Sequence, residues 1–134
     1  MRYAISFVVL PVIISIGSCV PFTYIVAFNH TGKDLTVTAD EKSYALSANS
    51  SAEILYPGFT REIKLASQDK AVWVYKIEVL PQEHMKGRWF SQYIFCQIEP
   101  DGRIYLVKPN TQMPIQALPI QPAGYPLIPL LKPG

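Results

Sequence analysis

The side chains best able to do chemistry in this chain are few and far apart in the sequence. There are two cysteines, Cys19 and Cys96, and two histidines, His30 and His84. Neither histidine has a cysteine or carboxylate at the spacing of a metal site, and the serines of 47–51 lack the strand-to-helix turn of a nucleophile elbow. The sequence therefore predicts a protein that is not an enzyme and has neither a metal site nor a cofactor; a small hydrolase that uses the long loop at 80–91 is the minor alternative.

Cys19 is distinguished by what precedes it. The chain opens with the positively charged Arg2, and residues 4–17 form an apolar, uncharged segment of signal-peptide length. Gly17 and Ser18 then place two small side chains directly before the cysteine. This pattern predicts an N-terminal signal helix that directs the protein out of the cytoplasm.

The four residues Ile16-Gly17-Ser18-Cys19 resemble the lipobox of bacterial lipoproteins, and the resemblance covers only the first 19 residues. It implies that residues 1–18 are removed as a signal peptide and that Cys19 is lipidated, so that the membrane is a partner through a lipid anchor. Because Val20 and not aspartate follows the cysteine, the resemblance further implies sorting to the bacterial outer membrane, facing the periplasm.

Two alternatives to lipidation stay open. Ordinary cleavage would release a soluble secreted or periplasmic module, although Ile16 and Ser18 make a poor A-x-A site. An uncleaved single-pass anchor is also consistent with the absence of Asp, Glu, Lys and Arg between Arg2 and Lys33, a run long enough to cross about 30 Å of hydrocarbon.

The second cysteine lies inside a predicted strand. Alternation places Cys96 on the same face as Ile94 and Ile98, where a thiol acts as a small buried apolar group. A disulfide between Cys19 and Cys96 is the alternative, because an even number of cysteines in an oxidising compartment favours pairing.

Short apolar segments separated by turn residues predict an all-β fold. We expect a single antiparallel β-sandwich of about seven strands, immunoglobulin- or transthyretin-like, over residues 24–108, after a linker at 19–23. In the segment 71–79 the alternation places Trp73, Tyr75, Ile77 and Val79 on one face. The strands are expected at 24–29, 35–39, 43–46, 53–56, 61–65, 71–79, 92–99 and 103–107.

The longer connection at 80–91 holds the candidate partner-binding residues Lys86, Arg88, Trp89 and Phe90. One interpretation is a crossover loop whose aromatic side chains cover the open end of the core. The other is a binding loop, because arginine and aromatic residues are enriched where proteins bind one another.

The segment 109–134 is a proline-rich tail with seven of the twelve prolines and no charge before Lys132. Its many apolar residues favour docking on its own domain, since disordered tails are usually poor in such residues. Capture by a partner groove and disorder are the alternatives.

The charge pattern limits the partners. A formal net charge of +2, without a basic cluster, argues against nucleic acid. Asn29-His30-Thr31 and Asn49-Ser50-Ser51 match the N-glycosylation acceptor pattern, which matters only in a eukaryotic secreted protein. Together these features predict a lipid-anchored, non-catalytic accessory, scaffold or binding module of the cell envelope, with an envelope protein as its further partner.

Overall fold

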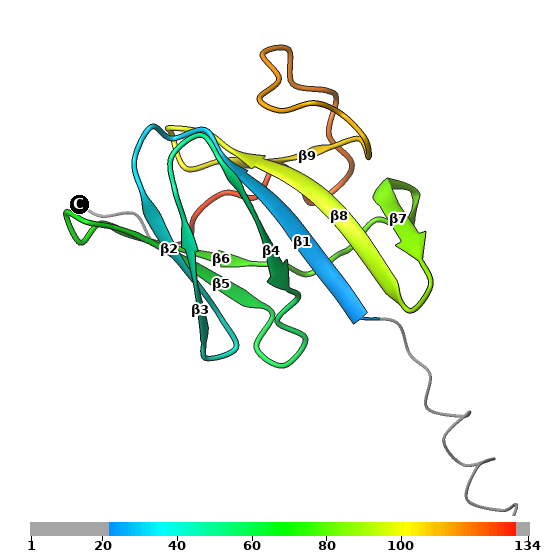
Figure 1. Cartoon of the computed structure of the whole chain (residues 1–134), viewed down its shortest axis with the longest axis horizontal. Helices are drawn as coiled ribbons and strands as arrows, with labels where there is room; N and C mark the ends of the chain where they lie inside the picture. The colour runs from blue at the N-terminus through cyan, green and yellow to red at the C-terminus, as the bar shows by residue number, and fades with distance from the viewer. Residues whose placement is uncertain (1–21, 131–134) are drawn as a thin grey trace, which may run out of the picture.

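The computed structural model describes residues 22–130, which form an all-β domain of two sheets (Figure 1). Cys19 and the predicted signal peptide lie outside the described residues. Within the described part there are nine strands, and the predicted all-β class is confirmed. The strands are β1 Phe22–Asn29, β2 Leu35–Ala39, β3 Lys42–Leu46, β4 Ser51–Leu55, β5 Glu62–Ser67, β6 Val72–Lys76, β7 Met85–Arg88, β8 Ser91–Ile98 and β9 Ile104–Val107, with a short 3-10 helix, η1, at Gln82–His84.

The first sheet runs in the order β4-β1-β8-β7, with β9 also paired to β8. β7 pairs with the first half of β8, and β9 pairs with its second half. The second sheet runs β3-β2-β5-β6. All strand pairs are antiparallel except β1 with β8, which are parallel over their full lengths. The expectation of a wholly antiparallel sandwich is therefore wrong at this one pair, and both β1 and β8 start at the same end of the domain.

The core lies between the sheets and follows the period-two alternation of the strands. On β8 the inward side chains are Ile94, Cys96 and Ile98, as the sequence predicts. On β6, Tyr75 is fully buried but Trp73 is only partly buried. The predicted inward face ends with Ile77, and Val79 is exposed, because β6 ends at Lys76 and the chain then leaves the sheet.

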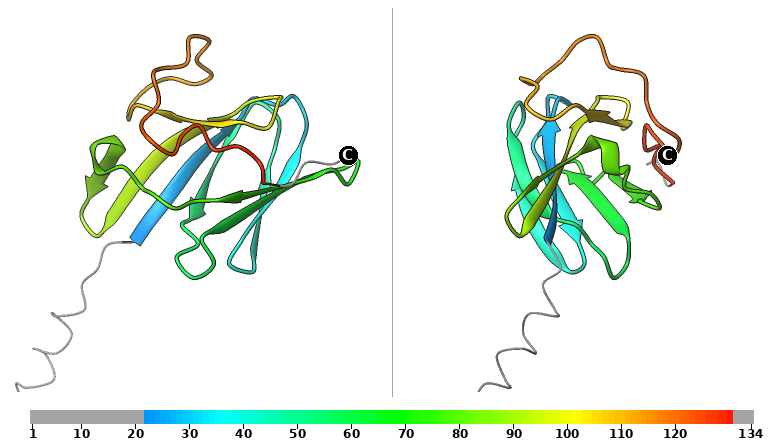
Figure 2. Two further views of the ribbon diagram at one scale, coloured as in Figure 1. Left: turned by 180° about the vertical axis from the view of Figure 1, so that it is seen from behind. Right: turned by 90° about the vertical axis from the view of Figure 1, so that its right-hand side faces the viewer.

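The proline-rich tail lies against the sandwich, in the docked arrangement that the sequence favours (Figure 2). It follows the free edge of β9, where Leu127 exchanges two backbone hydrogen bonds with Ile104. The amide of Gln121 continues this pairing, accepting from the backbone N–H of Leu106 at 2.7 Å and donating to its carbonyl at 3.0 Å. The N–H of Leu130 donates to the carbonyl of Val74 on β6. The tail thus covers the open edges of both sheets on one side, which blunts them against pairing with other chains.

Candidate functional site

The predicted loop at 80–91 is in fact the helix η1, the strand β7 and a two-residue turn. Met85–Arg88 pairs with Ser91–Ile94 in antiparallel register, so Trp89 and Phe90 form the tip of a β-hairpin. Sequence reasoning missed β7 because its four residues, Met-Lys-Gly-Arg, carry two charges and a glycine and show no apolar alternation.

Trp89 and Phe90 do not cover the core, so the interpretation of a capping loop is wrong. Trp89 is 91% exposed and Phe90 is 65% exposed. Trp89 has a φ of 54°, the left-handed region that tight two-residue hairpins require and that glycine or asparagine usually occupies. An L-residue there costs roughly 1–2 kcal/mol. Trp89 therefore holds its ring in solvent at the hairpin tip and gains no burial in return for this backbone conformation.

Two further phenylalanines lie at the same end of the sandwich. Phe22 at the start of β1 is 61% exposed, and its N–H donates to the carbonyl of Phe90 at 2.8 Å. Phe59, which is 93% exposed, lies in the β4–β5 connection. Figure 1 shows this connection and the β7–β8 turn at the end where β1 begins. We call this surface, formed by Phe22, Phe59, Trp89 and Phe90, the aromatic end.

The connection that carries Phe59 is held in place by Asp40. Its carboxylate accepts hydrogen bonds from the N–H groups of Phe59 and Thr60, at 3.0 and 2.9 Å, and from the Thr60 hydroxyl at 2.7 Å. The Thr60 hydroxyl is the main cause that lowers the pKa of Asp40 below its usual value. Phe59 is therefore exposed on a fixed backbone, and not on a segment that folds back onto the core.

The four predicted partner-binding residues are only partly brought together. Trp89 and Phe90 share the hairpin tip, whereas Lys86 points to the tail and donates from Nζ to Asn110 Oδ1 at 2.8 Å. Lys86 is the register partner of Tyr93, whose ring stacks on Tyr24 with centroids 5.5 Å apart. The side chain of Arg88 lies outside the described part of the structure.

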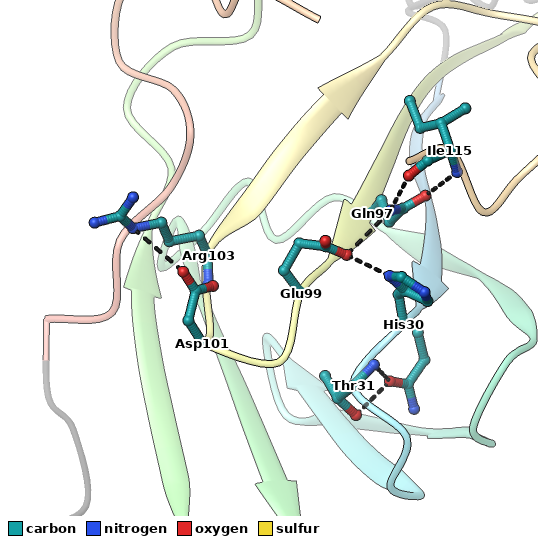
Figure 3. A network of polar contacts seen from close by, with 8 residues as sticks. His30, Thr31, Gln97, Glu99, Asp101, Arg103 and Ile115 are labelled. Carbon is teal, nitrogen blue, oxygen red and sulfur yellow. Dashed lines mark hydrogen bonds and ion pairs between the residues drawn. The ribbon is translucent and has the colours of Figure 1, made fainter. Parts of the chain in front are cut away.

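The opposite end of the sandwich holds a network of polar contacts (Figure 3). His30 Nδ1 lies 2.7 Å from Glu99 Oε2, and Gln97 Nε2 donates to the same oxygen at 3.0 Å. The fully buried Gln97 amide also exchanges two hydrogen bonds with the backbone of Ile115 in the tail. These groups satisfy one another and join the tail to β8, so the network is a structural one.

Asn29 shows the same structural character. It is fully buried, and its Nδ2 donates to the carbonyls of Lys33 and Leu46 at 2.6 and 3.0 Å. Its Oδ1 accepts from the N–H and the hydroxyl of Thr31, which fixes the β1–β2 turn. An amide nitrogen with both hydrogens engaged and no exposure is not available for a glycan.

Two further candidate groups for chemistry are the Cys96 thiol and the His84 imidazole. Burial raises the pKa of the Cys96 thiol to about 12, so at neutral pH it is protonated and unreactive. His84 Nδ1 is buried without a hydrogen bond, and the nearest carboxylate oxygen, on Glu83, is 3.9 Å away. Among residues 22–130, no cluster of three His, Cys, Asp or Glu side chains could hold a metal ion. The apolar cavity in the core, about 30 Å³, is far smaller than a small-molecule site.

Comparisons with models of known protein families, with curated protein sequences and with solved structures found no match. Residues 22–130 contain no helix that is long and apolar enough to cross a membrane. Among the described residues, the aromatic end is the candidate contact surface.

Proposed function

We propose that this protein is a lipid-anchored envelope protein of the bacterial outer membrane that acts as a non-catalytic accessory or scaffold on the periplasmic side. The observation that carries the proposal is the position of β1 relative to Cys19. β1 begins at Phe22, inside the predicted linker 19–23, so that only Val20 and Pro21 separate it from the cysteine. The anchor and the folded domain are almost continuous.

This short connection has a geometric consequence. Three residue steps span at most about 11 Å between the Cα atoms of Cys19 and Phe22. A lipid on Cys19 would therefore hold the aromatic end next to the membrane surface. A long linker would let the whole domain move away from the membrane, whereas this tether would keep the start of β1 beside it.

The non-catalytic part of the proposal is supported by the state of the polar groups. The His30–Glu99–Gln97 network is internally satisfied, and the Cys96 thiol is buried. The exposed aromatic contact area of the described surface lies at the aromatic end. We further propose that the two stacked, mostly antiparallel sheets belong to the immunoglobulin- or transthyretin-like class of sandwiches.

The anchor is tested by comparing the two cysteines. Mass spectrometry of the wild-type protein from its native envelope is expected to show an acylated Cys19 as the first residue, with the leader removed. Cys19→Ser should retain residues 1–18, because the thiol that accepts the lipid is absent.

Cys96→Ser is the matched control, since Cys96 is buried in the core, and it should be processed and lipidated like the wild type. An unmodified amino terminus at or beyond Cys19 would contradict the proposal and favour the soluble periplasmic or secreted module.

A further inference from the structure

The two ends of the sandwich differ sharply in character. Among the described residues, the four aromatic side chains that are exposed all belong to the aromatic end. The turns at the other end, 30–34, 47–50, 68–71 and 99–103, are polar. They carry the charged residues Lys33, Asp34, Asp69, Lys70, Glu99, Asp101 and Arg103. Exposed aliphatic side chains also occur elsewhere, at Val72, Val79, Ile120, Ile128 and Leu130, but the exposed aromatic ones are confined to one end.

The aromatic end is built to expose its rings. The Phe22 N–H is bonded to the Phe90 carbonyl, and the neighbouring Thr23 carbonyl accepts from the N–H of Tyr56, at 2.8 Å in each case. These bonds join the start of β1 to both the β7–β8 tip and the β4–β5 connection. Three separate segments therefore form one surface on a rigid frame, and ordering them costs little entropy on binding.

The residue types fit the boundary between lipid headgroups and acyl chains. Tryptophan and phenylalanine bury large apolar areas, about 150–250 Å² for each fully buried ring. Tryptophan is enriched at membrane–water interfaces, where its N–H can stay hydrated. Protein interfaces also use aromatics, so residue type alone does not decide between the two occupants.

The position of the anchor decides between them. Phe22 is the first described residue, and the lipobox-like cysteine precedes it by three positions. A lipidated Cys19 would bring the acyl chains within about 11 Å of the Phe22 backbone. At that distance Phe22, and the Phe90 backbone bonded to it, would lie beside the bilayer, which favours the bilayer over a protein as the occupant.

The charges around the aromatic end are mixed. Asp40 and Glu41 lie in the β2–β3 turn. Arg61 lies two residues after Phe59, and Lys76 donates to the carbonyl of Thr60. Opposite charges offset one another, so the attraction would come from apolar burial and would depend little on anionic lipid or on salt.

We propose that the aromatic end is a second membrane contact, in which Phe22, Phe59, Trp89 and Phe90 enter the lipid interface. This inference rests on the proposed function, because the anchor supplies the proximity. The contact holds the strands upright on the membrane and turns the polar end away from it, toward the periplasm.

The chain's two tryptophans lie at opposite ends and provide the test. Trp89 is at the hairpin tip, whereas Trp73 lies against Gly102 in the polar β8–β9 turn. The full-length lipidated protein is reconstituted into phosphatidylcholine vesicles with acyl chains brominated near the headgroup, and tryptophan emission is compared with that in unbrominated vesicles. Flotation of the vesicles is measured in the same samples.

Trp89 is expected to be quenched and Trp73 is not. Wild-type emission should therefore fall in brominated vesicles, and Trp89→Phe should abolish this fall. Trp73→Phe, which leaves Trp89 as the sole reporter, should show the larger fractional loss. If Trp73→Phe does not fold, the comparison of wild type with Trp89→Phe still isolates the contribution of Trp89.

The outcomes separate the inference from the proposed function. Protein that floats with the vesicles while Trp89 stays unquenched would keep the anchor and overturn the second contact, leaving the aromatic end free for a protein partner. Protein that does not float would overturn both. Flotation with quenching confined to Trp89, in the presence of high salt, supports the inference.

Discussion

Cys96 illustrates how a single residue's place in the fold sets its chemistry. It lies at the centre of β8, is 5% exposed, and has a pKa raised to about 12 by burial. Since the thiolate is the nucleophile, a thiol with this pKa is unreactive at neutral pH. The structure therefore keeps the second cysteine of the chain out of redox chemistry.

We expect native Cys96 to resist alkylation by iodoacetamide at pH 8 and to react fully once the protein is unfolded in urea. The mass of the modified chain measures this directly. Rapid modification of the native protein would show that β8 opens or that the inward assignment of Cys96 is wrong.

The same shift predicts a pH dependence of stability. The pKa of the thiol is higher in the folded protein than its ordinary value of 9.0. Between pH 9 and pH 12 the unfolded chain therefore releases a proton that the folded chain keeps, and the free energy of unfolding falls as the pH rises. Urea titration of wild type and Cys96→Ala should show a shallower alkaline loss in the variant, whereas identical slopes would argue against a shifted thiol.

For single residues, the sequence predicted the buried apolar positions better than the buried polar ones. Alternation placed Ile94, Cys96 and Ile98 inward, and all three are buried. Alternation could not predict the burial of Asn29 and Gln97, because their hydrogen-bond partners are brought to them by the fold. For Gln97 that partner is Ile115, 18 residues away.

The strands themselves followed from the sequence wherever an apolar alternation ran between turn residues. The segments 35–39 and 103–107 are within one residue of β2 and β9. β7 was missed because its pairing with β8, and not its own composition, makes it a strand. The β8–β9 hairpin has Pro100, Asp101 and Gly102 in its turn, and this turn packs closely against Trp73 of β6 and Pro129 of the tail.

Two features favour glycine at position 102, a positive φ and close packing around the α carbon. Gly32 has only the first, so comparing the two positions separates their contributions to stability. The φ of Gly102 is 88°, and an added Cβ would lie 3.0 Å from Trp73 Cε2 and 3.1 Å from Pro129 Cγ. Gly32 in the β1–β2 turn has a φ of 83° but nothing within 4 Å of the same position. Gly32→Ala is expected to cost only the backbone strain, about 1–2 kcal/mol.

Gly102→Ala should lose a further amount of about 1–3 kcal/mol, because Trp73 and the tail must shift to admit the methyl group. Urea denaturation of the two variants measures the difference. Equal losses would mean that the contact between the turn, Trp73 and Pro129 is not tight in solution.

For the whole molecule, the arrangement depends on topology that no local pattern encodes. The sequence predicted a sheet-rich domain and a docked tail, but not the parallel pairing of β1 with β8. That pairing places the start of β1 beside the β7–β8 tip and so creates the aromatic end. In the sequence its four aromatic residues lie in three segments, at 22, 59 and 89–90, and nothing in their spacing indicates one surface.

The tail is the last part of the whole-molecule arrangement, and its apolar residues are not equally buried. Leu127 is 9% exposed and joins the core cluster, whereas its neighbour Ile128 is 56% exposed and Ile120 is 98% exposed. Leu130 is 64% exposed as well, although its backbone N–H donates to the carbonyl of Val74. Docking is therefore carried by a few positions and by backbone pairing.

Leu127→Ala should lower the free energy of unfolding by about 2–5 kcal/mol, as for other buried leucines. Ile128→Ala removes a similar apolar side chain one residue away and should change the free energy of unfolding by no more than about 0.5 kcal/mol.

Truncation after Asn110 removes Leu127 and also exposes the edge of β9, which Gln121 and Leu127 cover in the intact chain. The truncated protein should therefore be less stable and also self-associate, because an uncovered strand edge pairs with other chains. Urea denaturation and light scattering measure the two effects. A truncated protein that stays monomeric and as stable as the intact one, with Leu127→Ala equal to Ile128→Ala, would show that the tail is not docked and is free for a partner.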